Sequence, residues 1–228
     1  MSDFVSFSEE EQYCLVQMDD GKANAIGFAM LEQLNAALDQ AEATGKPLVL
    51  AGRPGKFSAG FDLSIMGQGG PDQGTLLRGG ANLALRLLQH PTPVVLAVSG
   101  HALAMGGLMC LSGDYRIGIK GDFKIGLNEV AIGMTLPYFG IELARNRLLK
   151  NYFDRAVNMA EIYDAEGAVD AGYLDEAVDG DALLERAAAV ASSYSALNMA
   201  AHRNTKARTR EGLVANMQRA IAEDTGEV

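Results

Sequence analysis

Two wholly apolar segments, each introduced by a proline, restrict most strongly how this chain can fold. They are Pro47-Leu48-Val49-Leu50-Ala51-Gly52 and Pro93-Val94-Val95-Leu96-Ala97-Val98. A strand without alternating polar residues is typical of a sheet that is covered on both faces. A helical stretch around residues 75–89 separates the two segments. This strand–helix–strand order predicts a crossover connection and parallel pairing of the two strands.

The region before these strands predicts one more strand and one helix. Residues 12–18 have the composition of a strand that ends at the Asp19-Asp20-Gly21 turn. Residues 28–43 place Leu31, Leu34 and Leu38 on one face, which predicts an amphipathic helix. A further strand is expected at residues 115–119.

The remainder of the chain is predicted to be mainly helical. Half of residues 67–74 are glycine, which predicts a mobile loop before the helix at 75–89. From residue 137 onward the pattern is helical, with long helices at 181–197 and 199–222. We therefore expect an α/β core over residues 1–180. A helical C-terminal region over residues 181–228 completes the same functional unit.

The composition excludes several classes of protein. The chain has 228 residues, 48% of them hydrophobic, with a formal net charge of −10. Such acidity argues against general binding to nucleic acid or to an anionic membrane surface. No apolar stretch reaches the roughly 18 residues of a membrane span. The N-terminus lacks the pattern of a secretory signal, so we expect a cytoplasmic protein.

Cysteine and histidine give no sign of a metal site. Cys14 and Cys110 each lie within an apolar run, which predicts two buried thiols. The three histidines, His90, His101 and His202, are scattered along the chain. No spacing typical of zinc ligands occurs.

Familiar nucleotide and hydrolase motifs are also absent. The segment Gly52-Arg53-Pro54-Gly55-Lys56-Phe57 has two residues where a phosphate-binding loop needs four, and it ends in Phe rather than Ser or Thr. No Gly-x-Ser-x-Gly turn is present, and no Gly-x-Gly-x-x-Gly follows a strand. A serine hydrolase of that type and a dinucleotide cofactor are therefore not expected.

Two turns rich in small residues follow predicted strands. They are Phe57-Ser58-Ala59-Gly60-Phe61-Asp62-Leu63 and the segment from Ser99 to Gly107. Turns of this kind can leave backbone N–H groups free to bind a ligand, especially where a helix begins. Two such donors on neighbouring strands could hold one oxyanion. The alternative is that both are simply tight turns at the edge of a sheet.

The same segments carry a family resemblance. Lys22-Ala23-Asn24-Ala25-Ile26, the 57–63 segment and the Gly-rich turn at 100–107 that closes on Gly113-Asp114 resemble the crotonase superfamily in order and spacing. This is the family of enoyl-CoA hydratases and isomerases. The resemblance extends from about residue 12 to 220. It implies a crotonase-type α/β fold, a ββα superhelix, and homotrimers or dimers of trimers.

The resemblance also implies particular roles. The backbone N–H groups of Phe61 and Met105 would form the oxyanion site. An acyl-CoA would be the substrate, with coenzyme A as part of it and no other cofactor. The residues expected to line the substrate site are Lys22, Ala23, Ala59, Gly60, Phe61, Asp62, Leu63, Met105, Gly106 and Leu108.

One departure from the hydratase pattern favours a particular reaction. Family hydratases use two glutamates, and Leu108 occupies the position of the first, whereas Glu129 matches the second. The Ile125–Glu129 stretch resembles the 3,2-enoyl-CoA isomerases, which work with this one glutamate. Moving a double bond needs only the removal of a proton from C2 and its return to C4. One carboxylate can do both, and apolar neighbours raise its pKa toward neutrality.

Isomerisation of 3-enoyl-CoA through a dienolate is therefore the predicted function. Two alternatives remain open at this point. One is another crotonase reaction, such as hydration of enoyl-CoA or thioester hydrolysis, because one fold can host many chemistries. The other is a protein that binds CoA thioesters without catalysis.

Overall fold

A computed structural model describes residues 3–226 and contains two sheets. The larger has six strands in the order β1-β2-β3-β5-β7-β9, in which only β1 and β2 pair antiparallel. The smaller sheet is parallel, with the order β4-β6-β8. The strands of the larger sheet are β1 (Val5–Glu9), β2 (Cys14–Met18), β3 (Leu48–Ala51), β5 (Val94–Val98), β7 (Tyr115–Ile119) and β9 (Glu176–Val178).

The two apolar segments form the centre of the larger sheet, as predicted. β3 and β5 pair in parallel, with Leu48 opposite Val94. Their side chains alternate between two separate cores: Leu48 and Leu50 belong to the larger, whereas Val49 and Ala51 belong to the smaller. Both faces of these strands are therefore buried, which explains why they contain no polar residue.

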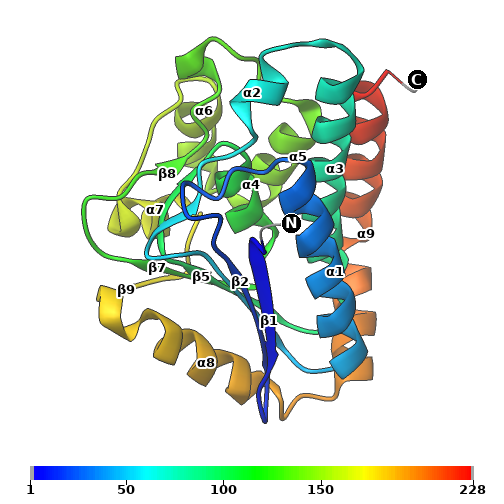
Figure 1. Cartoon of the computed structure of the whole chain (residues 1–228), viewed down its shortest axis with the longest axis vertical. Helices are drawn as coiled ribbons and strands as arrows, with labels where there is room; N and C mark the ends of the chain where they lie inside the picture. Colours follow the sequence, from blue (N-terminus) through cyan, green and yellow to red (C-terminus); the bar gives the residue numbers. More distant parts are fainter. Residues whose placement is uncertain (1–2, 227–228) are drawn as a thin grey trace.

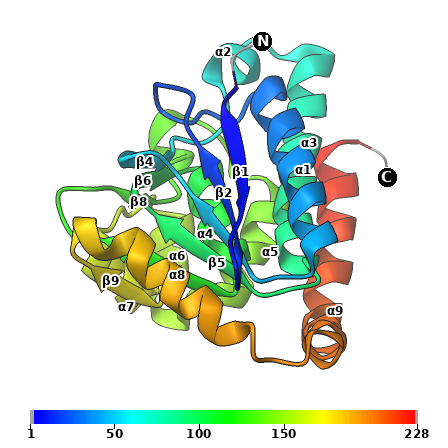
Figure 2. The ribbon, with the colours of Figure 1, turned by 60° about the horizontal axis from the view of Figure 1, so that its bottom comes forward.

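Helices cover the two faces of the sheet unequally. Helix α8 (Leu183–Tyr194) alone lies along one face, against β3, β5 and β7. Figure 1 shows it below the sheet, on the side opposite α1 and α3, and Figure 2 shows the same helix in a second view. On the other side lie α1 (Phe28–Thr44), α3 (Gly70–Gln89), α4 (Met105–Ser112), α5 (Tyr138–Arg147) and α9 (Met199–Asp224). The predicted α/β class and the helical C-terminal region are thus confirmed.

The prediction of a mobile loop over residues 67–74 is wrong for most of its length. Helix α3 already begins at Gly70, and Pro71 stands in its first turn together with Asp72. Proline fits the start of a helix because its missing N–H would have no partner there, and an acidic residue favours the positive end of the helix dipole. The high glycine content of residues 67–74 favours a loop, but these two residues favour the start of a helix.

The smaller sheet was not predicted, yet it positions the turns of interest. Its strands are β4 (Gly55–Ser58), β6 (Gly100–Leu103) and the two-residue β8 (Ile125–Gly126). Because the three are parallel, the segments that follow them emerge at the same edge. Those segments are residues 59–62, the start of α4, and the stretch that contains Glu129.

The remaining helices are short, and all but α2 lie in the C-terminal half. They are α2 (Leu63–Met66), α6 (Lys150–Val157), α7 (Ala165–Ala171) and two short 3₁₀ turns, η1 (Val130–Ile132) and η2 (Gly180–Ala182). Helix α9 packs along α3 and α5, which places the end of the chain beside its middle (Figure 1). Within residues 3–226, no helix combines the length and apolar character needed to cross a membrane.

Candidate active site

The turns after β4 and β6 approach each other closely at Gly60. This residue has a positive φ of 97°, and a Cβ added to it would lie 2.7 Å from Cβ of Ala104 and 3.3 Å from the backbone N of Met105. Only glycine fits a backbone approach of this kind at such a φ. The predicted pair of turns is therefore brought together, and the residues after Gly60 and after Ala104 become neighbours.

The N–H of Phe61 is free to bind a ligand. The N–H of Ile26 donates to the carbonyl of Gly60 over 2.8 Å, and the N–H of Asp62 donates to the carbonyl of Ile26 over 3.1 Å. These bonds hold the backbone on either side of Phe61. The N–H of Phe61 itself has no acceptor among residues 3–226.

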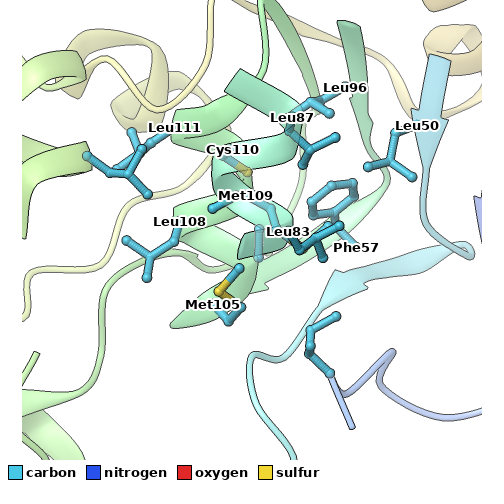
Figure 3. Packing of buried hydrophobic residues seen from close by; sticks show 14 of the residues in the cluster. Leu50, Phe57, Leu83, Leu87, Leu96, Met105, Leu108, Met109, Cys110 and Leu111 are labelled. Atoms are coloured by element: carbon cyan, nitrogen blue, oxygen red, sulfur yellow. The ribbon is translucent and has the colours of Figure 1, made fainter. Parts of the chain in front are cut away.

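The second free donor stands at the start of helix α4. The N–H of Ala104 donates to the carbonyl of Gly126, and the first bond of the helix runs from Leu108 to Ala104. No acceptor for the N–H of Met105 occurs in the described part of the chain. Helix N-termini attract negative charge. Figure 3 shows Met105 at this end of the helix, among buried apolar side chains. The two N–H groups can therefore serve one oxyanion.

Glu129 is a buried carboxyl without a partner. It lies just after β8, at the start of η1, and is 7% exposed. Its Oε2 atom makes no hydrogen bond with any described residue. Burial raises the pKa of Glu129 to about 7 from its usual 4.5, and a backbone hydrogen bond opposes this shift only in part. A carboxyl of this kind can accept and return a proton near neutral pH.

Glu129 and the two turns share one largely apolar cavity of about 400 Å³. Glu129 is the one carboxylate among the described residues of its wall. The wall also includes Gln73 from α3 and Asn128, whose Oδ1 atom is buried without a partner. The other lining residues are Ala59, Phe61, Leu63, Met66, Leu77, Ala104, Ile132, Met134, Thr135 and Pro137.

A second cavity, of about 820 Å³, adjoins the segment 59–65 from the side of β2 and α1. Lys22, Ala23 and Asp62 line it. The loop that presents Lys22 is fixed by Asn24, a fully buried residue whose side-chain amide donates to the carbonyls of Met18, Lys56 and Phe57. Asp62 forms part of the opposite wall. It also caps α2, since its side chain accepts a hydrogen bond from the N–H of Ser64 at 2.9 Å.

Comparison with known proteins decides the family. The family model described as enoyl-CoA hydratase/isomerase matches residues 8–226. The chain belongs to the enoyl-CoA hydratase/isomerase family. This confirms the predicted crotonase resemblance and shows that the chain belongs to a family of enzymes. Within the described residues, no group of His, Cys, Asp and Glu is arranged to hold a metal ion.

Relatives with solved structures share the fold over almost the whole chain. A Pseudomonas syringae protein of the same family is 44% identical, with a TM-score of 0.97 and coverage of 98% of this chain and 97% of its own. An enoyl-CoA isomerase from Mycobacterium tuberculosis is 39% identical, with a TM-score of 0.95 and full coverage of both chains. In a comparison of sequences alone, human mitochondrial enoyl-CoA delta isomerase 1 is 27% identical over 199 residues. These are 85% of this chain and 66% of the human protein.

Seven of the eleven residues assigned from the family resemblance line one of the two cavities. Ala59, Phe61, Leu63 and Glu129 line the first cavity, and Lys22, Ala23 and Asp62 line the second. Gly60 lies in the turn after β4, and Met105 and Gly106 form the start of α4; all three are buried.

Leu108 is placed differently from the rest. It is fully buried, and its side chain packs toward Leu136 and Gly140 of the α5 region. It is not among the described residues that line either cavity, so its role toward a substrate stays a prediction. Figure 3 shows it projecting from α4 next to Met105.

Sequence reasoning missed other wall residues. Gln73, Asn128 and Met134 line the first cavity. Of these, only Asn128 could have been expected there from the sequence, because it precedes Glu129. Tyr173 was also missed: it is fully buried, and the charge of Glu129 is among the influences that raise its pKa, after burial and Tyr163. Gln73 and Met134 come from segments whose course the sequence pattern did not indicate.

The basic stretch of α9 does not reach these cavities. Lys206 donates to Asp114 over 2.6 Å, and Arg210 donates to the other oxygen of the same carboxylate over 2.6 Å. Arg203, Lys206, Arg208 and Arg210 line a separate groove between α9 and the end of α3. Two of the cations in this stretch therefore have a structural partner within the fold.

Proposed function

We propose that this enzyme moves the double bond of a 3-enoyl-CoA to the 2-position. Glu129 removes a proton from C2 of the substrate and returns it to C4. The dienolate formed in between carries negative charge on the thioester oxygen. The N–H groups of Phe61 and Met105 would bind that oxygen, where charge develops.

The observation that carries the proposal is the solitary carboxyl. Glu129 is the one carboxylate in the described wall of the apolar cavity, and its pKa of about 7 suits reversible proton transfer near neutral pH. Hydration needs two groups, one to activate water and one to protonate carbon. The similar proteins include both isomerases and hydratases, so the choice between the two reactions rests on Glu129.

We infer that the coenzyme A part of the substrate occupies the second cavity. Phe61 and Leu63 line the first cavity, whereas Asp62 and Ser64 line the second, so the two cavities lie on either side of one short segment. We place the thioester at Phe61 and the rest of coenzyme A across this segment. Lys22 is exposed at the second cavity and supplies positive charge for the phosphates.

Hydration of 2-enoyl-CoA is the second candidate, because of Asn128. Its unpartnered Oδ1 atom lies beside Glu129 in the cavity wall and could accept a hydrogen bond from a water molecule. Glu129 would then have to act as both base and acid in that reaction.

The test is product analysis with 3-enoyl-CoA and 2-enoyl-CoA, incubated separately with the wild type and with Glu129→Gln. The Gln variant keeps the shape of the side chain and removes the base. We expect isomerisation by the wild type and a loss of roughly 10²–10⁴-fold in Glu129→Gln, with acyl-CoA affinity unchanged. Rapid formation of 3-hydroxyacyl-CoA by the wild type would favour hydration, and near-native turnover by Glu129→Gln would exclude Glu129 as the base.

A further inference from the structure

A pair of glycines occupies the middle of helix α3, where the helix passes the apolar cavity. Gly79 and Gly80 are interior to this helix of 20 residues. Glycine inside a helix costs about 1 kcal/mol relative to alanine. Neither residue has a positive φ, so the backbone conformation does not require glycine. At position 80, glycine is explained by the side chain that packs against it.

The ring of Phe61 fills the place of the missing side chain at Gly80. A Cβ added to Gly80 would lie 2.3 Å from Cε1 and 2.4 Å from Cζ of Phe61. Carbon atoms in contact prefer separations of about 3.5–4.0 Å, so the ring would have to move by roughly 1 Å or more. The atoms in question are the far end of a side chain, which can turn.

The surroundings decide the direction of that movement. The backbone of Phe61 is held through Ile26, which bonds to Gly60 and to Asp62. Met105, fully buried, places its Sδ atom 3.5 Å from the same added Cβ. The open side of the ring is the cavity itself, which Phe61 lines together with Leu77. A displaced ring therefore enters the cavity.

We propose that Gly80 determines the length of acyl chain that the enzyme accepts. By lacking a side chain, it lets the Phe61 ring lie against the backbone of α3 and leaves the cavity open to a chain that extends beyond the reacting carbons. The substrates are then thioesters with long, flexible aliphatic chains. This inference rests on the proposed function in one respect, that the apolar cavity receives the acyl group.

The same helix offers two matched controls. A Cβ at Gly79 would meet Cδ1 of Leu31 on helix α1 at 2.7 Å, so Gly79→Ala crowds the interior without facing the cavity. A Cβ at Gly74 would meet nothing within 4 Å. All three Gly→Ala changes raise helix propensity equally, and only Gly80→Ala displaces Phe61.

The experiment compares a six-carbon and a twelve-carbon 3-enoyl-CoA for the wild type and the three variants. For Gly80→Ala we expect kcat/KM with the twelve-carbon substrate to fall about 10–100-fold, the usual effect of losing space in an apolar pocket. With the six-carbon substrate it should change less than about threefold, because the Phe61 N–H stays in place. Gly79→Ala and Gly74→Ala should keep the wild-type ratio of the two substrates. An unchanged ratio in Gly80→Ala, or the same change in all three variants, would overturn the proposal.

Two further measurements keep the test decisive. Phe61→Leu retains the N–H and shortens the side chain, so combining it with Gly80→Ala should restore the twelve-carbon preference; failure to do so counts against Phe61 as the cavity wall. Calorimetric binding of saturated six- and twelve-carbon acyl-CoA needs no turnover. If the wild type does not isomerise but Gly80→Ala still loses affinity for the longer chain alone, the proposed reaction fails and the chain-length inference stands.

Discussion

At the scale of single residues, the proposed reaction depends on the surroundings of the Glu129 carboxyl. The carboxyl lies in a position from which water is largely excluded, and no described cation compensates it. The charged form is therefore costly, and the protonated and ionised forms become nearly equal in free energy near neutral pH. That balance suits a group which must take a proton and give it back within one turnover.

The pH dependence of the reaction should report this balance. Because burial raises the pKa of Glu129 to about 7, the base form dominates above that pH and disappears as the pH falls toward its usual 4.5. We expect kcat/KM to decrease about tenfold for each pH unit below the pKa. Steady-state kinetics with 3-enoyl-CoA measures this decrease at low pH. The residual activity of Glu129→Gln is the control, because it should not decrease with pH in this way. A wild-type profile that stays flat down to about pH 5 would show that burial does not raise the pKa of Glu129 to about 7.

Leu108 gives a second prediction at this scale. Its side chain packs among apolar residues of α4 and α5, so Leu108→Glu buries a carboxyl that lacks partners. Because the family resemblance places the first hydratase glutamate at this position, we expect a gain in hydration of 2-enoyl-CoA, kept modest because Leu108 is not among the residues that line the cavity, together with lower thermal stability. Leu108→Gln is the matched control because it brings polarity without an acid. Product analysis measures the gain, and equal hydration by the Glu and Gln variants would contradict it.

Some of these residues were accessible from the sequence and others were not. Phe61, Met105 and Glu129 were assigned through the family resemblance, whose motifs this chain matches in order and spacing, and their roles stay predictions. Gly80 was not assigned, because its significance lies in a contact with Phe61, nineteen residues earlier in the chain. Sequence patterns report periodicity along one element, whereas such a contact depends on how two elements pack.

At the scale of secondary structure, helix α9 is fixed to the sheet through Asp114. This carboxylate accepts from the N–H of Val94 at 2.7 Å, from Lys206 and from Arg210. The side chain of Lys206 is only 5% exposed. Removing one partner of a buried ion pair leaves the other charge uncompensated, which is far more costly than losing a surface pair.

Asp114→Asn should therefore destabilise the protein substantially. We expect the free energy of unfolding to fall by about 3–5 kcal/mol, measured by chemical denaturation. The matched control is Asp39→Asn, which removes an ion pair with Arg86 from a carboxylate side chain that is 74% exposed. That change should cost less than about 1 kcal/mol. Equal effects of the two substitutions would mean that Asp114 does not anchor α9.

Long elements with a clear apolar pattern could be predicted from the sequence, whereas very short ones could not. The strands β3 and β5 were predicted from their unbroken apolar runs, and the helices α1 and α8 from apolar residues that recur on one face. The strands of the smaller sheet have two to four residues, too few for a period to be recognised. Yet this sheet brings Phe61, the start of α4 and Glu129 to the same edge. The geometry of the site is therefore set by the elements that the sequence pattern signals least.

At the scale of the whole molecule, charge distribution governs how an anionic substrate is bound. The formal net charge is −10, so the protein as a whole repels the phosphates of coenzyme A. Positive charge that attracts these phosphates therefore has to come from individual basic residues near the binding site. Arg53 donates to the carbonyl of Lys22 at 2.8 Å and pairs with Asp19 at 2.9 Å, so it stabilises the loop that presents Lys22.

Lys22 should therefore carry much of the salt dependence of binding. We expect Lys22→Gln to weaken CoA binding by roughly 3–10-fold at low ionic strength and to flatten its dependence on salt, because an exposed charge pair is screened within about 10 Å at 0.1 M salt. Arg208→Gln is the matched control: it changes the net charge equally but lies in the separate groove along α9. Titration calorimetry across a salt series gives both quantities. If the two variants shift affinity and slope alike, the attraction comes from overall charge rather than from Lys22, and the second cavity is not where the phosphates bind.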